Sequence, residues 1–188
     1  MPIPHGPWII HNSTEQYRDK WLNVQRDDVT KPDGEPGKFA FIKLLPGVSV
    51  LALDDEGGAH LTSEFRYAVG RDSVEVVSGA IDEGEEPHAA ARRELREELG
   101  IEAEEWIDLG WLDPLTSQLV CPVNLYLARG LTFSESEREG TELIEAVTVL
   151  FDEAVSMVMD SRITHAPSCA LILKASEYLR VHPRDRQP

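Results

Sequence analysis

Apolar residues in the first part of the chain recur in short runs of strand length, separated by turn-rich stretches. Three β-prone segments come first, at residues 8–10, 17–30 and 38–45. The stretch 31–37 between the last two contains two prolines and two glycines, which predicts a hairpin. We therefore expect residues 1–45 to form a small antiparallel sheet with an aromatic face that includes Trp8, Trp21 and Phe39. Such a face packs either against the rest of the chain or against a second subunit.

After Pro46 and Gly47 the chain continues with further strand-length runs and ends in two segments of helical composition. The expected strands cover residues 48–53, 59–67, 74–77, 106–112, 120–129 and 143–150. Residues 152–160 and 167–181 favour helix, and the second segment carries its apolar residues at the spacing of one helical stripe. The pattern predicts an N-terminal sheet at 1–45, a main domain at 46–181 and a polar tail at 182–188.

The stretch 79–101 predicts a turn that leads into a helix. Pro87 suits the first helical turn, strong helix formers follow it, and Gly100 is placed to end the helix in a left-handed conformation. At about 100° per residue, three glutamates fall on one face of this helix, namely Glu94, Glu97 and Glu98. The apolar residues Ala91, Leu95 and Leu99 fall on another face. We therefore expect one face to be buried and the other to gather three carboxylates.

The same stretch fits the pattern Gly-x5-Glu-x7-Arg-Glu-U-x-Glu-Glu-x-Gly-U, in which U is a bulky apolar residue. Ordinary amino-acid frequencies give such a match a chance probability on the order of one in 10⁸ at a given position. A solvated acidic helix face, the usual explanation of clustered glutamates, does not account for the whole pattern. The chain therefore resembles the Nudix hydrolase family, whose signature it matches at every defined position. The resemblance implies an α/β fold, an α/β/α sandwich with a mixed sheet, that cleaves a diphosphate joined to another group and depends on a divalent cation.

The resemblance assigns metal-binding roles to particular residues. The implied ligands are the carboxylates of Glu94, Glu97 and Glu98 and the backbone carbonyl of Ser78. Oxygen ligands of this kind suit Mg²⁺, with Mn²⁺ as the alternative. We expect Arg93 to fix a glutamate by a bidentate pair, and Glu85 to have an orienting or peripheral role.

A general base is expected in the acidic segment 133–144, which lies between strands. A solvated loop is the ordinary fate of such a composition. In the branch of the family that hydrolyses ADP-ribose, however, a glutamate in the equivalent loop serves as the base. Glu142, which directly precedes a predicted strand, matches best, and Glu139 is second. The predicted catalytic residues are therefore Glu97, Arg93, Glu142 and Glu139.

Segments outside the signature resemble the ADP-ribose and nucleoside diphosphate sugar pyrophosphatase branch. They are residues 20–21, 32–34, 64–67 and 163–168. In relatives, the tryptophan that matches Trp21 stacks on the adenine, often across a dimer with exchanged N-terminal sheets, and the arginine that matches Arg66 contacts the diphosphate or ribose. Core packing is the alternative for Trp21. Relatives usually have alanine at the position of Ser78, and the loop 113–117 matches only loosely, so the nucleotide sugar stays open.

The formal net charge of −16 argues against binding to nucleic acid or to an anionic membrane. The same charge would repel a phosphorylated substrate unless bound cations reversed the local sign. Two cysteines are too few for a disulfide framework, and neither a signal peptide nor an apolar run of membrane-span length is visible. We therefore expect a cytoplasmic protein without a nucleic-acid or membrane partner.

Together these observations predict a Mg²⁺-dependent Nudix diphosphatase that acts on a nucleoside diphosphate sugar. ADP-ribose, cleaved to AMP and ribose 5-phosphate, is the first candidate substrate. A homodimer built through residues 1–45 is expected, because a small hairpin sheet is poorly stable alone. Two alternatives stay open. One is another nucleotide substrate, such as GDP-mannose, a dinucleoside polyphosphate or NADH, and the other is a catalytically idle nucleotide-binding module.

Overall fold

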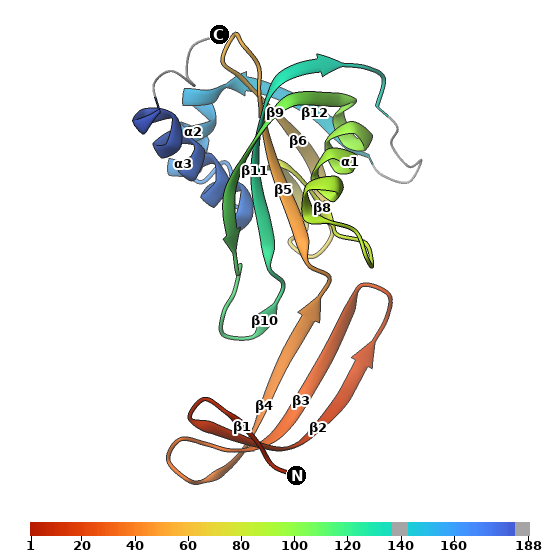
Figure 1. The fold of residues 1–188 in the computed structure, drawn as a ribbon, viewed down its shortest axis with the longest axis vertical. Coiled ribbons are helices and arrows are strands. Elements are labelled where there is room, and N and C mark those ends of the chain that lie inside the picture. Colours follow the sequence, from red (N-terminus) through yellow and green to blue (C-terminus); the bar gives the residue numbers. More distant parts are fainter. Residues whose placement is uncertain (137–142, 183–188) are drawn as a thin grey trace. The chain divides into compact units, whose positions relative to one another are not determined.

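The computed structural model describes residues 1–136 and 143–182 of the 188-residue chain (Figure 1). The chain forms two compact units. Residues 1–46 and 113–122 make up the first, which we call the N-terminal unit, and the remaining residues make up the main unit. The chain therefore enters the N-terminal unit twice, the second time through a segment that follows the signature helix.

The N-terminal unit is a sheet of five strands in the order β1-β2-β3-β4-β10. Their bounds are Ile3–His5 (β1), Trp8–Arg18 (β2), Leu22–Thr30 (β3), Pro36–Leu44 (β4) and Leu119–Val120 (β10). Strands β1 to β4 pair antiparallel in sequence order, and the β3–β4 hairpin confirms the turn predicted at 31–37. Strand β10 adds a short parallel edge next to β4, which the sequence did not indicate.

One sequence expectation in this sheet is wrong. The β-prone run 17–30 is not continuous, because the chain turns between the end of β2 and the start of β3. The carboxylate of Asp19 accepts hydrogen bonds from the backbone N–H groups of Trp21 (2.7 Å) and Leu22 (2.9 Å). An aspartate that satisfies the backbone in this way stabilises a tight turn, and it overrides the strand propensity of its neighbours.

The main unit is an α/β sandwich around a mixed seven-stranded sheet. Its strands are Gly47–Leu53 (β5), Gly58–Arg66 (β6), Arg71–Glu75 (β7), Val77–Ala80 (β8), Ile101–Leu112 (β9), Val123–Phe133 (β11) and Glu145–Leu150 (β12). Its helices are Pro87–Leu99 (α1), Phe151–Met159 (α2) and Ala166–Val181 (α3). The central path is β12-β6-β5-β11-β9, with β7 beside β6 and β8 beside β5. Among the described strands of this sheet, β5 and β11 pair parallel and the other neighbours pair antiparallel.

Strand β5 is buried along its whole length because helices cover both faces of the sheet. Val48, Val50 and Ala52 pack with the buried face of α1, so the alternate residues of β5 face the opposite side. Helix α3 contacts β5, β9 and β11. Figure 1 shows α1 on one side of the sheet and α2 and α3 on the other. This arrangement confirms the predicted α/β/α architecture. None of the helices among the described residues is long and apolar enough to cross a membrane.

Helix α1 begins and ends where the sequence predicts. Pro87 occupies the first turn, and Gly100 has a φ of 64° and donates its N–H to the last carbonyls of the helix. A left-handed residue at this point favours glycine, because a side chain there is strained. Ala91 and Leu95 are buried, as expected, and Leu99 packs at the edge of the same core. Burial of the apolar face thereby fixes the direction in which the glutamate face of α1 points.

The strand predicted at 74–77 is interrupted at Val76. Glu75 pairs with Thr62 of β6, whereas Val77 pairs with Val50 of β5, so the chain changes neighbours between these two residues. The Val76 N–H lies at this change and donates to the side-chain oxygen of Ser168 on α3 (3.0 Å). A side chain from a distant helix thus satisfies the backbone where the sheet ladder does not.

Candidate active site

Arg93 lies at the centre of a cluster of carboxylates beside the loop that leads into α1. Its Nε and Nη2 atoms donate to the two carboxylate oxygens of Glu85, at 3.0 and 2.9 Å. Its Nη1 donates to Glu94 Oε1 (2.7 Å) and Glu97 Oε2 (3.2 Å). Nη2 also donates to the carbonyl oxygen of Ala80 (3.0 Å). One guanidinium therefore ties α1 to the loop and to the end of β8. Its bidentate pair is with Glu85, not with a glutamate of the helix face.

The contacts between Arg93 and Glu85 favour the ionised form of both groups. The hydrogen bonds from Arg93 hold the pKa of Glu85 below its usual range, and Glu85, followed by Glu94, raises the pKa of Arg93. Glutamates at neighbouring positions on a helix face repel one another. Arg93 offsets part of that repulsion because Glu94 and Glu97 share its Nη1 atom.

Glu94 extends from α1 across the backbone of β8, where Gly79 makes room for it. A Cβ at Gly79 would overlap the Glu94 carboxylate. Glycine at this position therefore allows a carboxylate to approach the backbone next to Ser78. The Ser78 hydroxyl itself is engaged elsewhere, at 2.8 Å from the hydroxyl of Ser49 on β5. That contact accounts for a serine at this position.

The donor set on this face fits a divalent cation in chemical type. Glu94 and Glu97 supply hard carboxylate oxygens that converge on one nitrogen of Arg93, so the two groups lie on the same side of α1. Among the described residues, no three His, Cys, Asp or Glu side chains are already gathered into a metal-binding cluster. Arg93 occupies part of the carboxylate hydrogen-bonding capacity, and a cation would share these glutamates with it.

Arg66, at the end of β6, is paired with carboxylates on two sides. Its Nε and Nη2 donate to the two oxygens of Glu75 (3.1 and 2.8 Å), and its Nη1 lies 2.6 Å from Glu64 Oε2. Burial, the largest single influence, lowers the pKa of Arg66, but the carboxylates of Glu75, Glu64 and Glu98 raise it in sum. The charge of Glu98 therefore reaches Arg66. Glu98, on the acidic face of α1, is thus one of the carboxylates whose charge favours the protonated guanidinium.

Trp21 lies in the turn between β2 and β3 of the N-terminal unit, and it is 57% exposed. The Lys20 ammonium lies over its ring, 4.2 Å from the centroid. Core packing, the alternative role for this tryptophan, is therefore wrong. The predicted bases Glu139 and Glu142 lie outside the described residues.

Two features of the structure, one in each unit, were not found from the sequence. The first is Glu75, a nearly buried carboxylate (4% exposed) that holds Arg66. Its only signal in the sequence is a charged residue between valines in an apolar run, which is a rare place for glutamate unless it is paired. The second is a groove of about 610 Å³ in the N-terminal unit.

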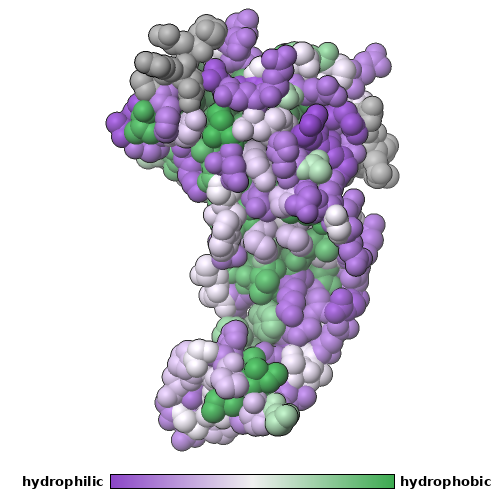
Figure 2. All heavy atoms as spheres, in the orientation of Figure 1, coloured by the Kyte–Doolittle hydropathy of each residue, from purple (hydrophilic) through white to green (hydrophobic). Residues whose placement is uncertain are grey.

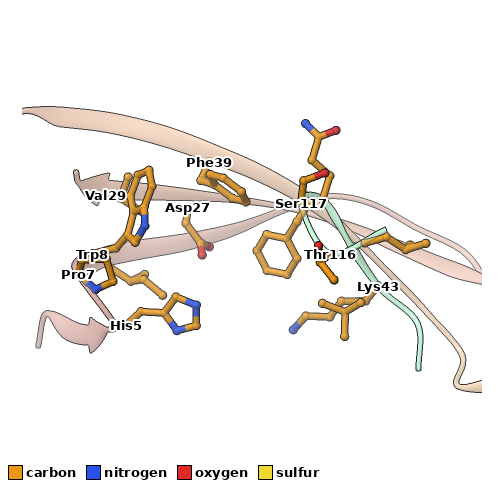
Figure 3. A pocket seen from close by; sticks show the side chains of 15 residues that line it. His5, Pro7, Trp8, Asp27, Val29, Phe39, Lys43, Thr116 and Ser117 are labelled. Carbon is orange, nitrogen blue, oxygen red and sulfur yellow. The ribbon is translucent and has the colours of Figure 1, made fainter. Parts of the chain in front are cut away.

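The groove is formed by the sheet face of the N-terminal unit and by the β10 segment, residues 116–120. Figure 3 shows Trp8 and Phe39 on one side of it, Lys43 and Thr116 on the other, and Asp27 between them. The rings of Trp8 and Phe39 meet edge to face at 5.7 Å. Figure 2 shows hydrophobic residues gathered on the surface of this unit. Trp8 and Phe39 of the predicted aromatic face thus line an open apolar groove, whereas Trp21, expected on the same face, is not among the lining residues. Part of the wall comes from a segment far along the chain.

Comparisons with known proteins extend over both units. Residues 43–162 match the family model of the NUDIX domain, and residues 8–42 match that of the nucleoside diphosphate sugar hydrolase N-terminal domain. An ADP-ribose pyrophosphatase of Bacillus subtilis is 30% identical over 164 residues, which cover 83% of this chain and 85% of the relative. A methanol dehydrogenase activator of Bacillus methanolicus is 29% identical over 155 residues, covering 80% and 83%. A crystal structure of an ADP compounds hydrolase, 21% identical, matches the fold with a TM-score of 0.82 over 97% of this chain and 96% of that one.

Proposed function

This chain belongs to the Nudix hydrolase family, and on that premise we propose that it hydrolyses the diphosphate bond of a nucleoside diphosphate sugar. ADP-ribose, cleaved to AMP and ribose 5-phosphate, is the first candidate substrate. The observation that carries the proposal is the pair of adjacent matches at 8–42 and 43–162, the first of which is to a domain of nucleoside diphosphate sugar hydrolases. The alignment with the Bacillus subtilis ADP-ribose pyrophosphatase covers 83% of this chain and supports the same substrate class.

The acidic face of α1 is proposed as the catalytic centre. Glu94, Glu97, Glu98 and the Ser78 carbonyl would hold Mg²⁺ or Mn²⁺, which when bound neutralises diphosphate oxygens and lowers the pKa of the attacking water. Arg93 keeps the carboxylates of Glu94 and Glu97 in place before substrate arrives, because both accept from its Nη1 atom. The chain's net charge of −16 supports a need for cations, since it would otherwise repel the diphosphate.

The remaining residues would bind the substrate and move the proton. Arg66 is 40% exposed and would grip the diphosphate in a fork geometry, and the exposed indole of Trp21 would stack on the adenine. Water attacks one phosphorus, the bond from that phosphorus to the bridging oxygen breaks, and the proton of the water passes to Glu142 or Glu139. Positioning and charge stabilisation carry most of such a reaction.

A substrate panel tests this function. ADP-ribose, ADP-glucose, GDP-mannose, diadenosine polyphosphates, NADH and nucleoside triphosphates are incubated with the protein and Mg²⁺, and the products are separated by ion-exchange chromatography. We expect AMP and ribose 5-phosphate from ADP-ribose at the highest kcat/KM. Release of inorganic pyrophosphate from triphosphates alone would reject the nucleotide-sugar assignment.

The glutamate set separates an enzyme from a nucleotide-binding module that has lost its activity. In the Glu97→Gln variant, we expect hydrolysis to fall by a factor of at least about 100, because a ligand carboxylate is lost. Glu104→Gln, on the exposed side of β9, serves as the matched control and should retain activity. Tight binding of ADP-ribose together with a trace hydrolysis rate that Glu97→Gln leaves unchanged would favour the binding module.

The groove of the N-terminal unit supports the proposed homodimer. Trp8, Phe39 and Phe41 line an apolar surface that a second copy of the chain would cover. We expect wild type to run as a dimer in size-exclusion chromatography with light scattering, and Phe41→Asp to run as a monomer. Met159→Asp, at an exposed apolar position on α2, is the control that should remain dimeric. A monomeric wild type, or a dimeric Phe41→Asp, would contradict the proposed interface.

A further inference from the structure

Glu75 is a nearly buried carboxylate whose partners come from segments far apart in the sequence. Its side chain is 5% exposed and pairs with Arg66 through both oxygens. A charge at this depth is costly unless it is paired and hydrogen-bonded. Burial, the largest influence, raises the pKa of Glu75, but Arg66, His165 and Ser73 together lower it below its usual value. The group is therefore a carboxylate, and it depends on all of its partners.

Two residues at the start of α3 supply further contacts around Glu75. The Nδ1 atom of His165 lies 3.3 Å from Glu75 Oε2 and is hydrogen-bonded with Ser168 Oγ at 2.9 Å. Ser168 is fully buried and accepts the N–H of Val76, the residue directly after Glu75 (3.0 Å). Side chain and backbone at the end of β7 are thus held by the same two residues of α3.

His165 is set between the carboxylate and the hydroxyl. Its Nδ1 lies closer to Ser168 Oγ (2.9 Å) than to Glu75 Oε2 (3.3 Å), so its hydrogen bond is with the hydroxyl and its contact with the carboxylate is electrostatic. Burial, the largest influence, lowers the pKa of His165. The charge of Glu75 raises this pKa and the charge of Arg66 lowers it, and the net shift is a decrease. Burial thus disfavours the charged imidazole, and the ring is held in place by Ser168 on one side and Glu75 on the other.

Arg66 needs this support because other carboxylates compete for it. Glu64 lies 2.6 Å from its Nη1, and the charge of Glu98 on α1 reaches the guanidinium. An arginine side chain also has high conformational entropy, and its rotation is restricted only by the groups that bind it. Without a fixed Glu75, Glu64 would be the remaining carboxylate in contact with the guanidinium, which would no longer be held in one orientation.

We propose that His165 and Ser168 are positioning residues, which hold the Glu75 carboxylate and thereby fix the Arg66 guanidinium in the orientation that receives the substrate's phosphate oxygens. The inference rests on the proposed function, because the contact between Arg66 and the diphosphate belongs to that function. It adds a contribution from α3, a helix outside the signature, to the binding of the substrate.

The test compares three full-length variants. His165→Ala removes the side chain that lies between Ser168 and Glu75, and His165→Asn restores a polar group near the position of Nδ1. Thr164→Val is the matched control, since it removes the neighbouring bond from Arg71 Nη2 (2.8 Å) and leaves Glu75 untouched. For ADP-ribose hydrolysis we expect His165→Ala to raise KM about tenfold with a smaller change in kcat, as a lost binding contact does. His165→Asn should recover most of the loss, and Thr164→Val should match wild type.

A double-mutant cycle with Arg66→Ala separates positioning from general damage. If His165 acts through Arg66, adding His165→Ala to Arg66→Ala should change kcat/KM less than twofold. The two losses would multiply if His165 served the fold alone, and that result would overturn the inference. An equal KM for His165→Ala and wild type would overturn it as well.

Proton NMR of the Arg66 Nε–H distinguishes failure of this inference from failure of the proposed function. The signal is assigned by its loss in Arg66→Lys. We expect its exchange with water to be slow in wild type and Thr164→Val and at least about tenfold faster in His165→Ala, since the hydrogen bond to Glu75 loosens. If no nucleotide sugar is cleaved but this difference is seen, the substrate assignment fails and the positioning of Arg66 stands. Equal exchange in all three proteins would refute the positioning.

Discussion

Gly79 lies beneath the Glu94 carboxylate, so an alanine there is expected to displace that carboxylate while leaving the backbone in place. The added Cβ would overlap only the end of the Glu94 side chain, and the backbone φ of Gly79 lies outside the left-handed region. Glu94 can swing away, and in doing so it loses its hydrogen bond from Arg93 (2.7 Å). Such a bond to a charged group contributes about 1.5–3 kcal/mol when shielded from water.

The expected loss of stability is small for two reasons. Arg93 and Glu94 are 25% and 14% exposed, so solvent weakens their pair. Replacing glycine also restricts the unfolded chain, which stabilises by about 0.4–1 kcal/mol. We therefore expect Gly79→Ala to lower the free energy of unfolding by about 1 kcal/mol. The activity should fall by a factor of at least about 10–100, the usual cost of disturbing groups that orient metal ligands.

The assay combines urea unfolding, followed by circular dichroism, with ADP-ribose hydrolysis and Mn²⁺ binding measured by electron paramagnetic resonance. Gly58→Ala is the matched control, because a Cβ there also meets a carboxylate, that of Asp54, in the β5–β6 turn. We expect Gly58→Ala to keep its Mn²⁺ affinity and Gly79→Ala to lose it. Full activity and unchanged Mn²⁺ affinity in Gly79→Ala would refute the assignment of Glu94 as a metal ligand.

Three further predictions concern the two arginine networks. Arg93→Lys should lower kcat by a factor of about 10–100 in steady-state kinetics. One ammonium cannot reproduce the paired hydrogen bonds of the guanidinium to Glu85 together with its bonds to the glutamates of α1. A kcat within twofold of wild type would contradict this prediction. Ser168→Ala should lower the free energy of unfolding by about 1–3 kcal/mol in urea titrations, since the buried Val76 N–H loses its acceptor, and an unchanged midpoint would show that another acceptor replaces it. The folded-state pKa of Glu75 lies below its unfolded value of about 4.3, so Glu75 stabilises the protein above that pH and loses this contribution as pH falls through the folded pKa. The stability difference between wild type and Glu75→Gln should therefore narrow below about pH 4, and a difference that stays constant to lower pH would count against the charged pair.

The parts of the fold that were predictable are those whose signal is local. The start, end and buried face of α1 follow from Pro87, Gly100 and the spacing of Ala91 and Leu95, all within one helix. The β3–β4 hairpin follows likewise from its turn residues. In these cases the residues that determine the structure lie close together in the sequence, so the sequence alone is sufficient to predict it.

The parts that were missed depend on contacts between distant residues or on a single side chain. The turn after β2 rests on two hydrogen bonds to Asp19, inside a run whose composition favours strand. The parallel β10 edge places Leu119 beside Ile42, and the sequence near either residue does not predict this pairing. Glu75 and His165 likewise meet only because α3 packs over the sheet at the end of β7.

Arg93 also bears on what happens when the metal is removed. Like-charged glutamates three and four positions apart cost only a few tenths of a kcal/mol per pair on a helix, against a domain stability of about 5–15 kcal/mol. Arg93 already offsets part of that repulsion through its bonds to Glu94 and Glu97, and the apolar face of α1 is buried without any contribution from the glutamates. We therefore expect excess EDTA to abolish hydrolysis but to lower the thermal unfolding midpoint by only a few degrees at most, with EDTA presaturated with Mg²⁺ as the control. Cooperative loss of helical circular dichroism on chelation at 25 °C would contradict this, because it would mean that the carboxylates need the cation in order to fold.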